Sequence, residues 1–63
     1  MQWHLARAAA GNAISQNIVG LAYRDGLDVP VDLHKAGDFL EKAATAGLPE
    51  AQYHLGELFA KAA

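Results

Sequence analysis

The chain has 63 residues, so it forms one domain at most, and a domain of this size hides only about 60% of the surface that its unfolded chain exposes. It contains no cysteine, which excludes disulfides and thiolate metal sites. The formal net charge is −2, and the charged residues are scattered without the basic stripe typical of nucleic-acid binders. No apolar run is long enough to span a bilayer.

Four helices are predicted, at roughly residues 2–10, 13–25, 33–46 and 49–62. Alanine is abundant and β-branched residues are few, which favours helix throughout. Gly11 followed by Asn12 closes the first helix and opens the second. Gly26 suits the left-handed residue that comes after a helix, so the second helix is expected to end just before it.

The second half of the chain carries equally clear punctuation. Pro30 disfavours helix at the residue before it, so a loop precedes the third helix. Asp32 is a good N-cap for that helix, and Gly47 ends it. Pro49 suits the first position of the last helix, where a missing N–H is not needed. Because no segment alternates with period two, we expect an all-α fold.

The sequence repeats itself with an offset of 36 residues. Gly11 and Gly47 stand 36 positions apart. The same offset pairs Trp3 with Phe39, Ala8 with Ala44, Gln16 with Gln52, Val19 with Leu55, Gly20 with Gly56, and Tyr23 with Phe59. A period in the middle thirties is typical of a helix–turn–helix repeat. Glycine inside a helix costs about 1 kcal/mol relative to alanine, so the paired glycines predict positions where neighbouring helices approach closely.

Two stretches of the chain carry a family pattern. One is the run from Ala51 to Phe59, Ala-Gln-Tyr-His-Leu-Gly-Glu-Leu-Phe. The other is the preceding loop and helix, with Gly26, Val29, Asp32, Lys35, Ala36, Phe39, Lys42, Ala43, Ala44 and Gly47. Together they resemble the Sel-one-like repeat, a relative of the tetratricopeptide repeat. The resemblance implies a right-handed α-α superhelix of antiparallel-paired helices that serves as an adaptor or scaffold and has no catalytic residues.

The resemblance divides a single helical-repeat domain, residues 1–63, into three parts. We expect the second helix of a partial repeat at 1–10, a complete repeat at 11–46 and the first helix of a further repeat at 47–63. An array generally needs about three repeats for stability, so a small natural array, an excised segment and an engineered piece are all open. Asn17, aligned with Tyr53, and Gly37 depart from the pattern, and each should loosen its helix slightly.

The groups capable of chemistry do not gather into a site. His4, His34 and His54 are far apart in sequence, whereas zinc ligands need fixed local spacing or convergence from facing helices. Acid–base catalysis needs carboxylates held in a water-poor cleft, and four short helices enclose little. Ser15, the only serine, has no histidine at helical spacing. We therefore expect no enzyme and no catalytic, cofactor-binding or metal-binding residue.

Most apolar residues are expected in the core. They recur at the three-and-four spacing of a buried face, in the sets Val19, Ala22 and Tyr23; Ala36, Phe39, Leu40 and Ala43; and Leu55, Leu58 and Phe59. Trp3 aligns with Phe39, so we expect a packing aromatic there rather than a ligand platform.

A second stripe on the first helix of each repeat is the candidate partner-binding surface. Its members are Ile14, Asn17, Leu21 and Arg24 in one copy and Glu50, Tyr53 and Glu57 in the other. In the resembled repeats this stripe lines the concave groove where partner peptides lie. One half would be apolar and the other acidic. The alternative is that Ile14 and Leu21 are covered by another helix of the same fold.

These features favour a module that binds another protein or a peptide, and neither nucleic acid nor membrane. The alternative is a structural, self-assembling fragment with no activity beyond oligomerisation. Trp3, Leu55 and Phe59 would be exposed on the terminal helices, which predicts a homo-oligomer, with a dimer favoured and head-to-tail open chains as the rival. The first residues lack the pattern of a secretory signal, which favours a cytoplasmic protein while leaving the compartment open.

Overall fold

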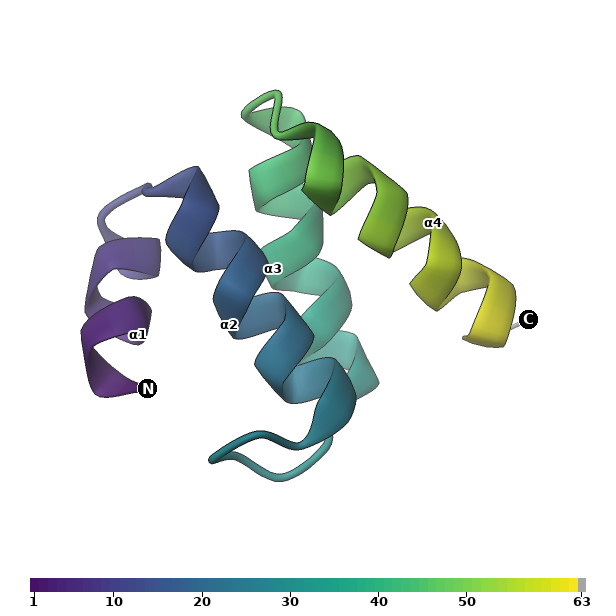
Figure 1. Cartoon of the computed structure of the whole chain (residues 1–63), viewed down its shortest axis with the longest axis horizontal. Helices are drawn as coiled ribbons and strands as arrows, with labels where there is room; N and C mark the ends of the chain where they lie inside the picture. The colour runs from purple at the N-terminus through teal and green to yellow at the C-terminus, as the bar shows by residue number, and fades with distance from the viewer. Residues whose placement is uncertain (63) are drawn as a thin grey trace.

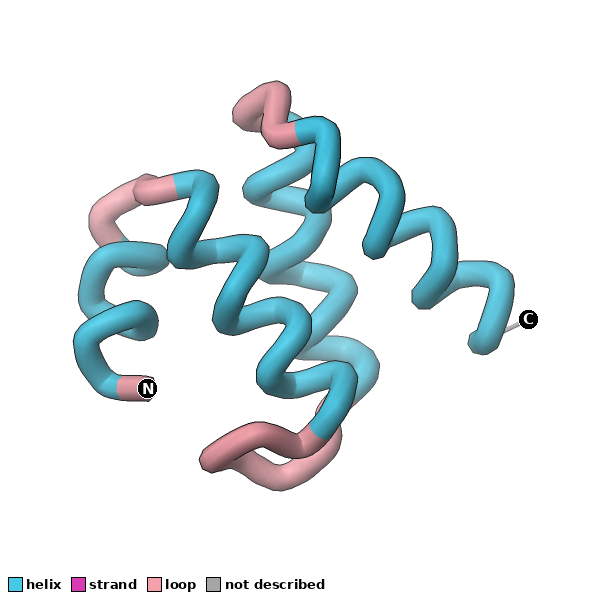
Figure 2. The backbone as a smooth tube through the Cα atoms, viewed as in Figure 1, coloured by secondary structure: helices cyan, strands magenta, loops and turns pink. Residues whose placement is uncertain are grey.

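The computed structural model describes residues 1–62, which form four helices and no strand. The helices are α1 (Gln2–Ala9), α2 (Ala13–Asp25), α3 (Leu33–Thr45) and α4 (Pro49–Ala62). Short loops join them, as Figure 2 shows. The predicted all-α fold and its four helices are confirmed, and each helix end lies within one residue of its predicted position.

Side-chain caps fix the starts of α2 and α3. The Asn12 side chain accepts a hydrogen bond from the backbone N–H of Ser15 at 2.9 Å. The Asp32 side chain accepts one from the backbone N–H of Lys35 at 3.1 Å. Each bond satisfies one of the N–H groups that a helix leaves without a partner in its first turn. Gly26, with φ of 72°, ends α2 in the left-handed region.

The turns after α1 and α3 have the same structure. Gly11 and Gly47 both have φ of 94°, a conformation that favours glycine. Their N–H groups donate to Ala8 O and Ala44 O at 3.0 and 2.9 Å. The same two carbonyls accept the side-chain amides of Gln16 and Gln52, at 3.1 and 3.3 Å. The 36-residue sequence repeat is therefore also a repeat of hydrogen bonds.

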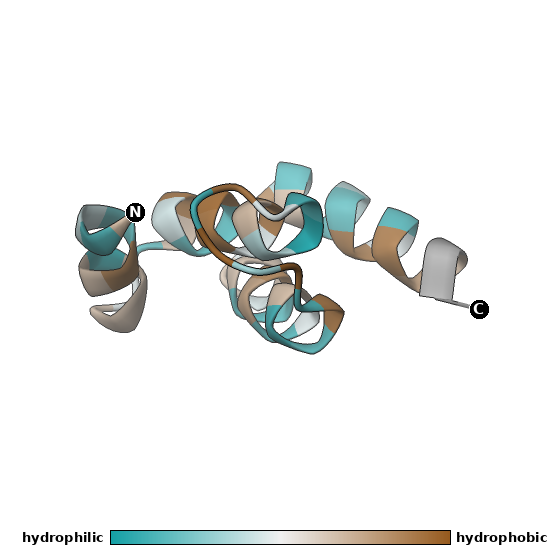
Figure 3. Cartoon of the chain, turned by 90° about the horizontal axis from the view of Figure 1, so that it is seen from below, coloured by the Kyte–Doolittle hydropathy of each residue, from teal (hydrophilic) through white to brown (hydrophobic). Residues whose placement is uncertain are grey.

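The helices form a flat array with α1 and α4 at its two ends (Figure 1). The molecule measures 31 × 27 × 14 Å along its principal axes, and Figure 3 shows the array edge-on. Consecutive helices pack on one another, most extensively α2 on α3, and α2 also contacts α4. None of the described helices is long and apolar enough to cross a membrane.

The core is built from small residues and a few large ones. Its main cluster joins α3 to α4 through Ala36, Leu40, Ala43, Ala51 and Leu58, and Val19 of α2 is also fully buried. Gly20 brings α2 close to α3, since a Cβ there would lie 2.7 Å from Leu40 Cγ and 3.2 Å from Ala36 O. The close approach predicted at Gly20 is confirmed.

Three sequence expectations about packing are wrong among the described residues. A Cβ built at Gly56 would meet no atom of a neighbouring element within 4 Å, so no helix approaches there. Phe59 and Trp3 are 57% and 63% exposed, so the packing expected from periodicity is absent, whereas the exposure expected for the terminal helices is present. The remaining predicted core residues are buried or half-buried. All three exceptions lie on the terminal helices, where one side of the helix has no neighbour in the described structure.

Candidate interaction surface

The predicted partner-binding stripe lies on α2 and α4, two helices that contact each other. Ile14 and Tyr53 are 63% and 66% exposed, among the most exposed large apolar side chains of the described chain. Glu50 is also exposed. The remaining members, Asn17, Leu21, Arg24 and Glu57, are half-buried. Three of the seven members of the stripe are therefore exposed, and four are half-buried.

Arg24 and Glu57 connect the two helices. Arg24 Nη1 lies 3.8 Å from Glu57 Oε1, while the same guanidinium makes two 2.9 Å bonds to the carboxylate of Asp25. The hydrogen bond to Asp25 raises the pKa of Arg24, the charges of Asp25 and Glu57 raise it further, and burial opposes them. Glu57 Oε1 also lies 3.2 Å from His54 Nδ1. Glu57, one of the two acids in this half of the surface, thus lies beside a guanidinium and an imidazole.

Asn17 brings a polar atom with unmet bonding capacity into this surface. Its Oδ1 is buried and has no hydrogen-bond partner among the described residues. An unsatisfied buried acceptor costs about 1–3 kcal/mol. The aligned position in the other copy is Tyr53, which points a large exposed side chain outward instead. The departure noted at Asn17 is therefore a local chemical difference between the two halves of the surface.

Leu21 belongs both to this surface and to the core. It packs against the buried cluster of α3 and α4. It also lines a hollow between α1 and α2 together with His4, Ile18 and Leu27. Ile14 is uncovered, whereas Leu21 is partly covered, so the two residues whose burial was in question behave differently.

Sequence reasoning missed Ile18 and Leu27 as part of the exposed apolar surface. Ile18 is one turn from Ile14 on α2, and Leu27 stands 59% exposed in the following loop. The stripe predicted from the sequence takes its members at i, i+3 and i+7 and so omits Ile18. The i+4 spacing, equally typical of one helix face, contains the signal that would have found it.

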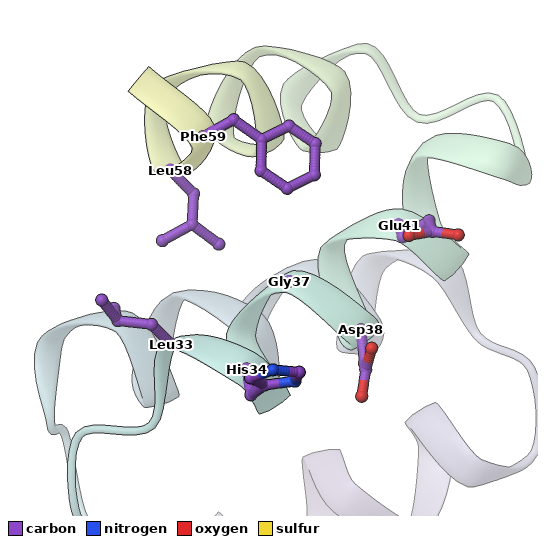
Figure 4. Close-up of a pocket in the computed structure, with 7 residues that line it drawn as sticks. All are labelled: Leu33, His34, Gly37, Asp38, Glu41, Leu58 and Phe59. Atoms are coloured by element: carbon purple, nitrogen blue, oxygen red, sulfur yellow. The ribbon is translucent and has the colours of Figure 1, made fainter. Parts of the chain in front are cut away.

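A second hollow lies between α3 and α4 (Figure 4). Leu58 and Phe59 of α4 face Gly37 across it, with Asp38 and Glu41 of α3 at its edge. In the part of the chain that the structure describes, no three His, Cys, Asp or Glu side chains gather closely enough to hold a metal. Ser15, the only serine, is 2% exposed, which shields its hydroxyl from any substrate.

These features define a helical-repeat protein. Its helices pair antiparallel, its turns at Gly11 and Gly47 repeat after 36 residues, and α2 and α4 share one surface. The Sel1 repeat model matches residues 13–48 and 49–63, which together cover more than half of the chain. The chain belongs to the Sel1 repeat family, and the resemblance seen in its sequence is confirmed. The two matches begin at the first residues of α2 and α4. No curated protein and no solved structure matches the chain.

Sel1 repeats are helical repeats that generally mediate protein–protein interaction and are generally not catalytic. For this chain, membership in the family supports an interaction module at that level of detail. The partner, the residues that contact it and the state of assembly are taken up below as proposals.

Proposed function

We propose that this chain is a non-catalytic interaction module that binds a protein or peptide across the surface shared by α2 and α4. The contact residues would be Ile14, Asn17, Leu21, Arg24, Glu50, Tyr53 and Glu57. One observation carries most of the proposal: Ile14 and Tyr53 stand 63% and 66% exposed on neighbouring helices of a chain whose family generally binds proteins. Contiguous exposed apolar patches mark interaction sites, whereas single exposed apolar residues are common, and the contact between α2 and α4 places these two side chains on adjoining helices.

The chemistry of this surface suggests the kind of partner. Ile14 and Tyr53 offer apolar contacts, while Glu50 lies exposed on the same stripe and favours a basic residue in the partner. The Oδ1 of Asn17 is buried without a hydrogen-bond partner in the described chain, so it would accept a hydrogen bond from a partner N–H only when the side chain turns outward. The best match is an amphipathic or extended peptide with basic residues beside apolar ones.

The direct experiment is selection of short random peptides displayed on phage, followed by binding measurements with variants. Ile14→Glu should weaken binding of the selected peptides at least about tenfold, because it places a charge where an apolar side chain should dock. Its effect on the free energy of unfolding should stay below about 0.5 kcal/mol, since Ile14 is exposed. Leu21→Glu is a poorer test, because Leu21 also packs against the core.

Val31→Glu is the matched control, since Val31 is an apolar residue 60% exposed in the loop before α3, outside the stripe. It should leave peptide binding unchanged. Equal binding by the Ile14 and Val31 variants, or selected peptides without basic and apolar residues together, would contradict the proposal.

The acidic half of the surface gives a second readout. Changing Glu50 and Glu57 together to lysine should slow association with basic peptides at low salt, and added salt should then speed association where it slowed it before, because attraction has become repulsion. Stopped-flow binding at two ionic strengths measures both effects. An unchanged association rate would place the peptide elsewhere on the molecule.

Self-assembly is the second candidate function. The product would be a homo-oligomer, and its smallest form would be a dimer. Its support is the exposure of Trp3 on α1 and Phe59 on α4, two large apolar side chains at opposite ends of the array (Figure 1). Light scattering over a range of concentrations tests it, with a mass that rises above that of one chain as the expected result. A constant monomer mass at high micromolar concentration would remove this candidate.

A further inference from the structure

The packing of α2 on α3 shows what a complete pair of helices in this chain looks like. The rings of Tyr23 and Phe39 stack with their centroids 5.9 Å apart and an interplanar angle of 7°. Lys42 lies over the Phe39 ring, with its Nζ 5.5 Å from the centroid. Gly20 makes room for Leu40, because a Cβ there would lie 2.7 Å from Leu40 Cγ. This aromatic stack and this close approach define the contact between the two helices of one repeat, α2 and α3.

The residues of this contact have counterparts 36 positions away in the chain. The counterparts of the α2 residues lie on α4 and that of Phe39 of α3 lies on α1, and these two helices lie at opposite ends of the array (Figure 1). On α4, Phe59 and Gly56 correspond to Tyr23 and Gly20. On α1, Trp3 corresponds to Phe39. Arg7 lies over the Trp3 ring, 4.8 Å from its centroid, although the 36-residue offset aligns Arg7 with Ala43 and not with Lys42.

Among residues 1–62, no other helix covers either half. Phe59 is 57% exposed and Trp3 63% exposed, and no atom of a neighbouring element would meet a Cβ at Gly56 within 4 Å. Because α1 and α4 lie at opposite ends of the array (Figure 1), the two halves of one chain are too far apart to meet. Two copies of the chain can bring them together.

We propose that α1 of one copy docks on α4 of a second copy in the way that α3 docks on α2, so that the two helices complete a repeat. In this contact Trp3 stacks on Phe59, and the open face of Gly56 admits the docked helix. By the 36-residue offset His4 takes the position of Leu40 and Arg7 that of Ala43, so α1 carries polar side chains where α3 has fully buried apolar ones. The proposal deepens the self-assembly candidate above and is independent of peptide binding at Ile14 and Tyr53.

The charges at the two faces are of opposite sign. The hollow between α3 and α4 has an apolar floor at Leu58 and Phe59 and carries Asp38 and Glu41 at its edge (Figure 4). The exposed side of α1 carries Arg7. An arginine brought to an acidic rim aids encounter and fixes orientation. The α1 face of a second copy, which carries Arg7, is therefore complementary in charge to this edge of the hollow, although the whole chain has a formal net charge of −2.

The contact should be weak and directional. The eight residues of α1 match only the second half of the thirteen-residue α3, so the buried area falls toward the low end of specific interfaces. The two faces differ, so the association is head-to-tail rather than two-fold symmetric. A dimer forms first as concentration rises, and further copies add at its free ends. This geometry favours the head-to-tail alternative over the closed dimer expected from general frequency.

Two variants block the two faces separately. Trp3→Ala removes the aromatic ring from α1. Gly56→Gln fills the open face of α4, and the monomer tolerates it because a side chain there meets no neighbour. Each variant alone should remain monomeric by sedimentation velocity at concentrations where the original chain associates, with affinity weakened at least about tenfold. An equimolar mixture keeps one intact contact and should form a dimer and nothing larger.

Ala60→Gln is the matched control, because Ala60 is exposed on the same helix and corresponds to Arg24. It should associate like the original chain. If the Gly56 variant loses helix content by circular dichroism, Phe59→Ala replaces it in the mixing experiment. Peptide binding at the α2–α4 surface should be unchanged in all these variants, which separates this proposal from the interaction module.

Three results would overturn the proposal. One is a chain that stays monomeric at high micromolar concentration. Another is a Trp3→Ala variant that associates as well as the original, as a symmetric contact between two α4 helices would produce. The third is a mixture of the two blocked variants that remains monomeric.

Discussion

The pair α2–α3 and the terminal helix α4 contain the same residue pattern in two different environments. Gly20 lies against Leu40, whereas Gly56 faces open space. Tyr23 stacks on Phe39, whereas Phe59 is 57% exposed. The difference teaches that these residues are specified by the repeat rather than by the contacts visible within one chain. The same amino acid at equivalent positions should therefore respond in opposite ways to the same substitution.

The largest effect is expected from the core of the complete pair. Leu40→Ala should lower the free energy of unfolding by about 2–5 kcal/mol, because Leu40 is fully buried and its removal leaves a cavity. A chain of this length has roughly 3–9 kcal/mol in total. Phe59→Ala should change the free energy by less than about 1 kcal/mol in the monomer. Urea unfolding of both variants at low concentration makes the comparison, and equal losses would show that α4 is packed as tightly as the α2–α3 pair.

The glycines should give effects of opposite sign. Gly20→Ala forces Leu40 to move, and this strain of about 1–3 kcal/mol should outweigh the helix propensity gained. Gly56→Ala meets no neighbour and should stabilise the monomer by up to about 1 kcal/mol through helix propensity alone. Thermal unfolding at a concentration where the chain is monomeric tests both. Shifts in melting temperature of the same sign for the two variants would contradict the distinction between filled and open faces.

The smallest effect is expected at the ion pair between α2 and α4. Glu57→Gln should lower the free energy of unfolding by less than about 1 kcal/mol, because the pair is 3.8 Å long and the Glu57 side chain is 40% exposed. The raised pKa of Arg24 keeps its charge at every pH at which a protein is normally handled. The difference in free energy of unfolding between the original chain and the Glu57→Gln variant should therefore fall with added salt and nearly vanish at about 1 M, where screening is strong. A loss above about 2 kcal/mol would make this pair part of the structural core.

Local signals made the helices predictable from the sequence. Asn12 and Asp32 cap through bonds to residues three positions away, and Gly47 and Pro49 act at adjacent positions. Such contacts depend on neighbours in sequence, so one sequence suffices to read them. The offset of 36 residues added the architecture, because residues that repeat in sequence also repeat in packing, as the hydrogen bonds of Gln16 and Gln52 show.

The sequence predicted less about burial at the ends of the array and about the candidate surface. Periodicity identifies the face that Phe59 and Trp3 share with core residues, but it carries no information on whether a neighbouring helix is present to cover that face. The orphaned Oδ1 of Asn17 and the dual position of Leu21 also depend on how α2 sits against other helices. These properties arise from tertiary contacts and required the structure.

Emission from Trp3, the only tryptophan in the chain, tests most directly whether α1 and α4 are two halves of one repeat. In the monomer the indole is 63% exposed and should emit at the long wavelength of a hydrated ring. As concentration rises, docking on Phe59 of a second copy should shift the emission to shorter wavelength, and Gly56→Gln should abolish the shift. An emission maximum that stays constant while the mass doubles would contradict the account, because the chains would then be associating through other faces.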